Sequence, residues 1–253
     1  MPPSTARNAD GSALRALRVL EAVGKPGGPH RLGQISREAD VTKPSTHRIL
    51  RGLLDAGYVI TDGEGAYGPG PRAYALSALF ATGQHGEAET ILRRLQAEVE
   101  QTVHVALRSG THAIYVQKID SDRPYRMASR IGGHIPLHCT AIGKVILAHL
   151  DPDERQAILA ATGLPPRTAR TITEPARLEA ELARVRADGY AVDDEENEDT
   201  IRCVAAALVD GSGKAIGGLS ISTITFQLGR DELLAFVPRL TETAKLLAPA
   251  YGH

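Results

Sequence analysis

Short polar and basic side chains gather near the start of the chain, in the run Val41-Thr-Lys-Pro-Ser-Thr-His-Arg-Ile-Leu50. At about 3.6 residues per turn, a helix over this run places Ile49, Leu50 and Leu53 on one face and Arg48 on the opposite one. An arginine can donate two hydrogen bonds to guanine, a serine can reach a base or a phosphate, and a helix N-terminus attracts phosphate. This run therefore has the chemistry for recognising DNA in the major groove. The residues expected to do so are Thr42, Lys43, Pro44, Ser45, His47, Arg48 and Arg51.

A second candidate lies in the back half, where the start of a helix could bind an acid. A pair of glycines and a proline precede Thr140, which then opens an apolar helix. Threonine is a good N-cap, and the backbone amides of Ala141 and Ile142 would remain free at the helix N-terminus. Such amides can bind a carboxylate. The simpler alternative is that Thr140 only caps its own helix.

Further polar side chains follow this helix along the chain. Six acidic residues occupy the seven positions from Asp193 to Asp199. A solvated loop would explain them, and they lack the spacing of a calcium-binding loop. Cys203 begins an apolar strand, and Ser220 and Ser222 alternate along another, so these three side chains could face one cavity. Buried serines are often simple hydrogen-bonded fillers, and both interpretations stay open.

The sequence gives little support to an enzyme. The run Gly143-Lys-Val lacks the features of a phosphate-binding loop, and no Gly-x-Ser-x-Gly motif occurs. Cys139 adjoins His138, but neighbours along the chain do not by themselves form an activated nucleophile. We therefore expect no catalytic residue, no cofactor and no metal. The possible zinc ligands, which lack paired spacing, are His134, His138, Cys139 and Cys203.

The basic run must be positioned by the elements around it. Apolar spacing predicts a helix from its cap Ser12 to residue 23 and a second over residues 32–39. A third follows to residue 56, with Thr42 as its cap, and residues 58–61 and 66–67 are predicted to form a hairpin. This order is that of a winged helix-turn-helix, whereas a single amphipathic helix would indicate only a protein surface. The hairpin has no Lys or Arg, so we expect it to make only minor contacts with DNA.

The rest of the chain alternates less regularly between helices and strands. Residues 72–82 are predicted to form a short helix that leads away from the first domain, and residues 83–86 a hinge. Hairpins without a strand–helix–strand alternation favour an antiparallel sheet with helices packed on it. The expected strands are 102–108, 112–119, 125–131, 190–193, 203–209 and 215–222. The expected helices are 87–101, 141–149, 153–160, 174–188 and 231–247.

Composition excludes several classes of protein. The chain has 253 residues, of which 42% are hydrophobic, so disorder is excluded and one large or two modest domains are expected. Two cysteines cannot form a disulfide framework, and no apolar run approaches a membrane span, which favours a cytoplasmic protein. Lys and Arg number 29 against 30 Asp and Glu. Residues 1–70 have a slight excess of positive charge, which permits nucleic-acid binding without requiring it.

Taken together, these residues resemble the IclR family of bacterial transcriptional regulators, over nearly the whole chain. The most specific segment is Gly189-Tyr-Ala-Val-Asp-Asp-Glu-Glu196, followed after six residues by Cys203-Val-Ala205 and then Leu208-Val-Asp210. It follows the family signature at every place except Val209, where an aromatic residue or His is usual. The run 41–50 looks like the recognition helix of the family, and residues 135–144 look like its pocket helix. The wing departs from the family, because Tyr67-Gly-Pro-Gly70 stands where Tyr-Arg-Leu-Gly is usual.

The resemblance implies an α+β protein in which a linker helix joins a winged helix-turn-helix domain to a GAF-like effector-binding domain. The implied ranges are 1–70 for the DNA-binding domain, 71–86 for the linker helix and 87–253 for the effector-binding and oligomerisation domain. It also implies homodimers or homotetramers on pseudo-palindromic double-stranded operator DNA, responding to a small molecule such as an organic or aromatic acid, with no membrane. The implied pocket residues are Ala141, Ile142, Asp193, Cys203, Ser220 and Ser222, with Met127, Ile135 and Ile201 as apolar walls.

The sequence leaves the ligand undefined. Asp193 suits an anionic ligand only if it is protonated or accepts a hydroxyl group, so a hydroxylated acid and a neutral compound are equally compatible. The operator, the sign of regulation and the choice between dimer and tetramer are not encoded in any motif. Two other classes remain as alternatives. One is a small-molecule enzyme or metal-dependent hydrolase in the back half, and the other is a protein-interaction adaptor.

Overall fold

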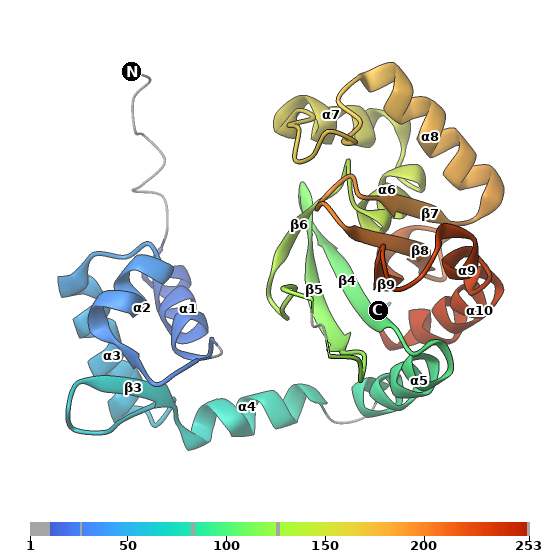
Figure 1. Ribbon diagram of the computed structural model, residues 1–253. Helices are drawn as coiled ribbons and strands as arrows, with labels where there is room; N and C mark the ends of the chain where they lie inside the picture. Colours follow the sequence, from blue (N-terminus) through green and yellow to red (C-terminus); the bar gives the residue numbers. More distant parts are fainter. Residues whose placement is uncertain (1–10, 26, 82–83, 125–126, 252–253) are drawn as a thin grey trace. The chain divides into compact units, whose positions relative to one another are not determined.

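The computed structural model describes residues 11–25, 27–81, 84–124 and 127–251, and its chain path is drawn in Figure 1. It divides into two compact units, Met1–Thr82 and Gly83–His253, each with its own hydrophobic core. No helix in the described ranges has both the length and the apolar character to span a membrane.

The first unit is a small helical bundle with a three-stranded sheet. Its core is formed by Val19, Ile35 and Leu50, one from each of the first three helices, which therefore pack through their apolar stripes. The strands are antiparallel in the order β1-β3-β2, and β1 is an addition to the predicted two-stranded wing. The elements are α1 (Ser12–Val23), β1 (His30–Arg31), α2 (Leu32–Glu38), α3 (Lys43–Asp55), β2 (Val59–Thr61), β3 (Ala66–Pro69) and α4 (Pro71–Ala81).

Of the two predicted helix caps of this unit, that of α1 is wrong, and that of α3 is right in position but not in its hydrogen bond. Ser12 is the first residue of α1, and Gly11 occupies the cap position. Thr42 is at the N-cap of α3 but its hydroxyl donates to the Oγ of Ser45, 3.1 Å away, instead of capping a backbone amide. At the other end of α3, Gly57 has a φ of 77°, a left-handed conformation that stops the helix at little cost for glycine.

The second unit is built on a six-stranded, fully antiparallel sheet with the order β6-β5-β4-β9-β8-β7. Its strands are β4 (Thr102–Ser109), β5 (His112–Ile119), β6 (His134–Pro136), β7 (Ala191–Asp194), β8 (Ile201–Val209) and β9 (Ala215–Ile224). Its helices are α5 (Gln84–Val99), α6 (Ala141–Ala148), α7 (Pro152–Thr162), α8 (Pro175–Asp188), α9 (Arg230–Leu234), α10 (Val237–Leu247) and the 3-10 turn η1 (Ala248–Ala250).

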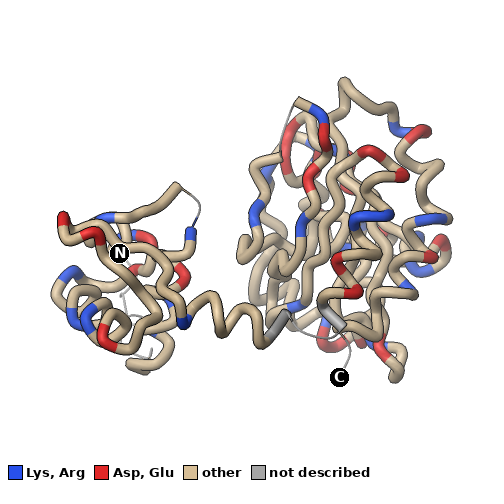
Figure 2. Tube along the Cα trace, turned by 90° about the horizontal axis from the view of Figure 1, so that it is seen from below, with Lys and Arg blue, Asp and Glu red and all other residues tan. Residues whose placement is uncertain are grey.

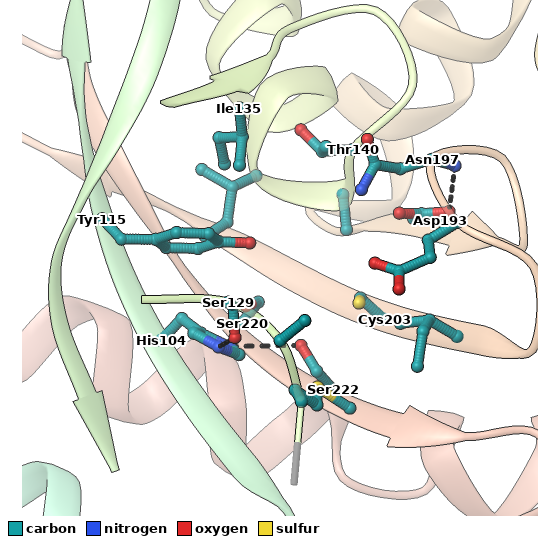
Figure 3. Close-up of a pocket in the computed structure, with 16 residues that line it drawn as sticks. His104, Tyr115, Ser129, Ile135, Thr140, Asp193, Asn197, Cys203, Ser220 and Ser222 are labelled. Carbon is teal, nitrogen blue, oxygen red and sulfur yellow. Dashed lines mark hydrogen bonds between the residues drawn. The ribbon is translucent and has the colours of Figure 1, made fainter. Parts of the chain in front are cut away.

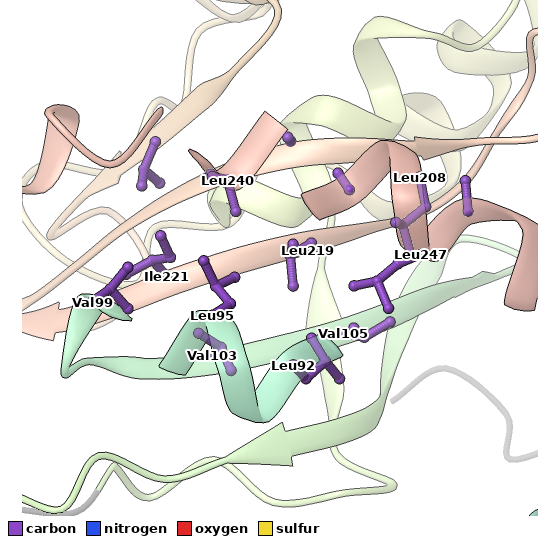
Figure 4. Close-up of a cluster of buried hydrophobic side chains, with 14 of the residues drawn as sticks. Leu92, Leu95, Val99, Val103, Val105, Leu208, Leu219, Ile221, Leu240 and Leu247 are labelled. Atoms are coloured by element: carbon purple, nitrogen blue, oxygen red, sulfur yellow. The ribbon is translucent and has the colours of Figure 1, made fainter. Parts of the chain in front are cut away.

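Helices cover both faces of this sheet. On one face, Leu92 of α5 and Leu240 of α10 pack on Val103, Val105 and the strands beside them (Figure 4). On the other face, α6 and α8 form a second core against the same strands. Because side chains alternate along a strand, the residues between those of the first core point towards α6. His104, Cys203, Ser220 and Ser222 are such residues, and the sheet therefore gathers them on one face.

Two predictions for the second unit are wrong, and a third falls partly outside the described residues. The described part of the predicted strand 125–131 forms no strand, because Lys118 Nζ donates to the carbonyl oxygens of Met127 and Ser129 and holds an irregular segment instead. The predicted last helix is broken between α9 and α10, since Pro238 has no amide to donate to the preceding turn. In the predicted hinge 83–86, Gly83 lies outside the described residues and the others belong to α5.

Candidate functional site

The exposed face of α3 carries the side chains predicted to contact DNA. Lys43, Pro44, His47, Arg48 and Arg51 are exposed, as is Thr42 just before the helix, and Ser45 is half-buried. On the opposite face Thr46 is fully buried, and its hydroxyl donates to the backbone oxygens of Val41 and Thr42, 3.2 and 3.0 Å away. The buried and exposed faces of α3 are therefore those that the spacing of about 3.6 residues per turn predicts. Lys, Arg, Asp and Glu are interspersed along this unit (Figure 2), so the predicted charge excess is local to α3.

The second unit contains a pocket between α6 and the sheet, with about 520 Å³ of space free of protein atoms, its mouth included (Figure 3). All nine residues predicted for an effector site line it: Met127, Ile135, Ala141, Ile142, Asp193, Ile201, Cys203, Ser220 and Ser222. Seven further residues that sequence reasoning missed complete the described lining: His104, Tyr115, Ala128, Ser129, Thr140, Asn197 and Glu198.

One end of the pocket is the N-terminus of α6. Thr140 caps this helix, since its Oγ1 accepts a hydrogen bond from the amide of Gly143 at 3.0 Å and donates to the carbonyl oxygen of Pro136 at 2.7 Å. Ala141 and Ile142 come next, and no preceding turn of helix exists to accept hydrogen bonds from their amides. Both residues line the pocket. The positive end of the helix dipole and these amides can bind an anion there.

Asp193 stands at the end of β7 beside this helix start. Its Oδ1 accepts hydrogen bonds from the amides of Glu196 at 2.8 Å and Asn197 at 3.2 Å. Burial nevertheless raises the pKa of the Asp193 carboxyl to about 7, because only 3% of the residue is exposed. Near neutral pH a substantial fraction of this carboxyl is protonated and able to donate. The conflict between an acidic side chain and an anionic ligand is thereby reduced.

The floor of the pocket is polar and comes from β4, β5 and β9. His104 lies with Nε2 2.8 Å from Ser129 Oγ and with Nδ1 3.3 Å from Ser222 Oγ. Burial lowers the pKa of His104 to about 3, so the ring is neutral at physiological pH. The ring of Tyr115 lies 4.8 Å from that of His104, centroid to centroid, and its hydroxyl points into the cavity (Figure 3). One signal for His104 existed in the sequence, since it interrupts the apolar run Val103-His-Val-Ala.

The side chains considered for catalysis or metal binding are not activated. Burial raises the pKa of both thiols, that of Cys139 to about 12, so both are protonated thiols rather than nucleophilic thiolates. His138 Nε2 is paired with the carbonyl oxygen of Pro165 at 3.1 Å. Within the described ranges, no group of three or more His, Cys, Asp or Glu side chains is arranged to hold a metal ion.

Two family profiles match the chain. The profile described as IclR helix-turn-helix domain matches residues 12–63, and that described as bacterial transcriptional regulator IclR C-terminal matches residues 82–248. The HTH-type transcriptional regulator KdgR of Escherichia coli is 33% identical, and the match covers 96% of this chain and 93% of that protein. The transcriptional repressor IclR of the same organism is 30% identical, with 95% and 90% covered.

Solved structures agree with these matches. An IclR transcriptional regulator from Alicyclobacillus acidocaldarius superimposes with a TM-score of 0.84 at 26% identity, covering 95% of this chain and 98% of the other. An IclR homologue from Microbacterium hydrocarbonoxydans, solved in complex with 4-hydroxybenzoate, gives a TM-score of 0.79. At 20% identity, with 95% of this chain and 100% of the other covered, that likeness establishes the fold alone.

Proposed function

The chain belongs to the IclR family of bacterial transcriptional regulators, and from this membership we propose that it binds a pseudo-palindromic operator. A small acid in the pocket lowers or raises the affinity of the protein for this operator. Its relatives are DNA-binding regulators and not enzymes. Its fold is the α+β combination of a winged helix-turn-helix and a GAF-like domain. The protein acts as a homodimer or homotetramer, because a two-fold operator requires two recognition helices about one duplex turn (roughly 34 Å) apart.

The proposed division of labour follows the two units. Residues 1–70 bind DNA, residues 71–86 form the connecting segment that includes α4, and residues 87–253 bind the effector and oligomerise. In the first domain, the exposed side chains of α3 read the operator. Support comes from the orientation of that helix, which buries Thr46 and Leu50 and exposes Lys43, Arg48 and Arg51.

The observation that carries the effector proposal is that one pocket brings together the amides of Ala141 and Ile142, which the Thr140 side chain does not cap, with Asp193, Ser220 and Ser222. The amides bind the acid group, while the hydroxyls and the partly protonated Asp193 bind other polar atoms of the ligand. An aromatic acid is one member of this class, and 4-hydroxybenzoate occupies the homologue from Microbacterium hydrocarbonoxydans.

The response requires two arrangements of the oligomer that bind DNA differently. An effector shifts their populations only by the difference in its affinity for the two, and equal binding shifts nothing. A ligand held between α6 and the sheet can bind unequally if the pocket differs between the two arrangements. The segment around α4 then transmits the difference to the DNA-binding domain.

The test is genomic footprinting with the purified full-length protein, followed by DNA titrations with a panel of small acids at fixed salt. We expect protected sites with two-fold symmetry, and at least one acid that changes the operator affinity. Genes beside the sites would indicate which metabolite to add to the panel. Salt-independent binding, or the absence of any protected site, would contradict the DNA-binding part of the proposal.

A further inference from the structure

His104 is hydrogen-bonded to two serines in the floor of the pocket, one of which, Ser222, also has a side-chain hydrogen bond with Cys203. It bridges two serines that are distant in the sequence, Ser129 in the irregular segment after β5 and Ser222 on β9. The close-up in Figure 3 draws the ring beside Ser129 and Ser222, with a dashed line to the hydroxyl of Ser222. All three residues line the pocket, so the hydroxyls that bind the ring also face a ligand.

The surroundings of His104 keep its ring uncharged. Burial and the positive charge of Lys118 both lower the pKa of His104 and so disfavour a charged ring, while the negative charge of Asp120 partly offsets this effect. Lys118 is itself fixed, because its Nζ donates to the carbonyl oxygens of Met127 and Ser129 at 3.0 and 2.7 Å and forms an ion pair with Asp120 at 2.8 Å. The same lysine thus keeps Ser129 in place beside the ring.

An uncharged imidazole has one N–H group and one nitrogen that accepts. A serine hydroxyl has a single proton, with lone pairs to spare. When His104 donates to Ser129 through Nε2, Ser222 must donate its own proton to Nδ1. Ser129 then keeps a proton for the ligand, whereas Ser222 offers only lone pairs. In the other tautomer the two serines exchange these roles.

We propose that His104 is a specificity-determining residue, because its single ring proton gives Ser129 and Ser222 opposite hydrogen-bonding character towards the ligand. A change of tautomer exchanges the donor and the acceptor without moving a side chain. Because one serine donates and the other accepts in either tautomer, the floor of the pocket can form hydrogen bonds with a hydroxyl group or with a carbonyl group of the ligand. It disfavours an apolar group at the same place, because the proton of one serine and the lone pairs of the other, which the ring does not use, would then have no partner.

The class of ligand follows, and this step rests on the proposed function. If the amides of α6 bind the acid group, the ligand is a small acid that carries a hydroxyl or carbonyl group as well. Tyr115 contributes a further donor, because burial raises the pKa of its phenol and its hydroxyl points into the cavity (Figure 3).

The hydrogen-bonding roles can be tested without a ligand, by ¹⁵N NMR of the histidine rings in the full-length protein. In Ser222→Ala the nitrogen Nδ1 loses its partner, so we expect the proton on Nε2, donated to Ser129. In Ser129→Ala we expect it on Nδ1, donated to Ser222. The two variants should therefore show opposite assignments of the protonated nitrogen. A His104→Gln variant identifies the signals.

The chain provides matched controls for this experiment. Ser222→Thr and Ser129→Thr keep the hydroxyl and should keep the wild-type tautomer distribution. His149, whose Nδ1 lies 2.8 Å from the carbonyl oxygen of Val145, should hold its proton on Nδ1 in every variant. The same tautomer in both alanine variants, or a charged ring at pH 7, would overturn the proposal.

The ligand class is tested by calorimetry with matched acids, namely lactate, pyruvate and propionate, and 4-hydroxybenzoate, 4-formylbenzoate and 4-methylbenzoate. If a set of three acids binds, we expect the dissociation constants of its hydroxy and oxo acids to agree within about tenfold. The apolar acid of the same set should bind at least about tenfold more weakly. Equal binding of the apolar form would overturn the ligand class. If no small acid binds or alters operator affinity, the proposed function fails, while the NMR result still decides the role of His104.

Discussion

Lys144 and Glu196 form an ion pair in the interior of the second unit, with Nζ 2.6 Å from Oε1 and side-chain exposures of 1% and 10%. A second carboxylate, that of Glu181, lies 3.1 Å from the same Nζ. Lys144 is on α6, whose first amides open onto the pocket, and the amide of Glu196 binds Asp193. The ion pair therefore connects the loop after β7, which lines the pocket, to α6, whose N-terminus forms one end of the pocket.

Replacing Lys144 by methionine is expected to destabilise the protein strongly. The Lys144→Met variant leaves the buried Glu196 without its counter-ion, a change that typically costs about 3–5 kcal/mol. The free energy of unfolding in urea measures the loss. The double variant Lys144→Met/Glu196→Gln removes the orphaned charge and should recover part of it.

Lys214→Met is the matched control, because the ion pair of Lys214 with Glu154 is 3.8 Å long and Lys214 is exposed. Its loss should change the stability by at most about 1 kcal/mol. A Lys144→Met variant as stable as this control would contradict the structural role of the buried pair.

Arg48→Ala is expected to weaken operator binding by about 1–3 kcal/mol if the arginine contacts a base, and to relax sequence preference at one position. Fluorescence anisotropy at several salt concentrations distinguishes this from the loss of a phosphate contact, which weakens all sequences alike. Arg177→Ala, at an exposed position of α8 in the other unit, is the control. Unchanged affinity of Arg48→Ala would remove this residue from the DNA interface.

Asp193→Asn is expected to change how stability depends on pH. The pKa of Asp193 is raised by burial from 3.8 to about 7, so the folded state binds the extra proton between these values. The contribution of Asp193 to the free energy of unfolding is complete below pH 4. It is lost as the pH rises to 7, by on the order of 4 kcal/mol. The asparagine variant lacks this loss, so its stability relative to the wild type should increase from pH 4 to pH 8.

The comparison between variant and wild type is necessary because His104 has the opposite effect. Its pKa is lowered to about 3, so its contribution falls as the pH decreases from 6.5. Asp210→Asn is a control of opposite sign, since hydrogen bonds from Ser212 and Lys214 lower the pKa of the exposed Asp210. A difference between Asp193→Asn and wild type that does not vary with pH would show that Asp193 is ionised throughout.

Ser220→Ala and Cys203→Ala are expected to impair the response to an effector without changing DNA affinity in its absence. Both side chains line the pocket, and neither belongs to the DNA-binding unit. Operator titrations with and without an acid that affects the wild type provide the measurement. A normal response in both variants would show that the effector binds elsewhere.

The exposed face of α3 and the pocket beside α6 differ in how much of each can be predicted from sequence. The orientation of α3 depends on local spacing, so the apolar stripe through Leu50 predicts which residues are exposed. The full set of pocket residues follows only from the family resemblance, because local spacing suggests the amides of Ala141 and Ile142 and a shared cavity for Cys203, Ser220 and Ser222 but leaves simpler interpretations open. All nine of its predicted residues line one cavity, although their role in binding an effector stays a prediction.

Contacts between distant parts of the chain were not predictable. His104 pairs with Ser222 across 118 positions, and this contact exists only because β4 lies beside β9 in the sheet. Nothing local in the sequence gives that strand order. Lys118 likewise captures an irregular segment whose composition suggested a strand. The break between α9 and α10, in contrast, could have been predicted from Pro238.

The start of α6 has a consequence for how proteins of this kind diverge. Every amino acid except proline supplies the same N–H group at positions 141 and 142, so the acid-binding site that we propose at these amides survives mutational drift. Side chains around it can change independently. Under the proposed function, a lineage can thus exchange one metabolic signal for another while the main-chain amides that bind the acid keep their position.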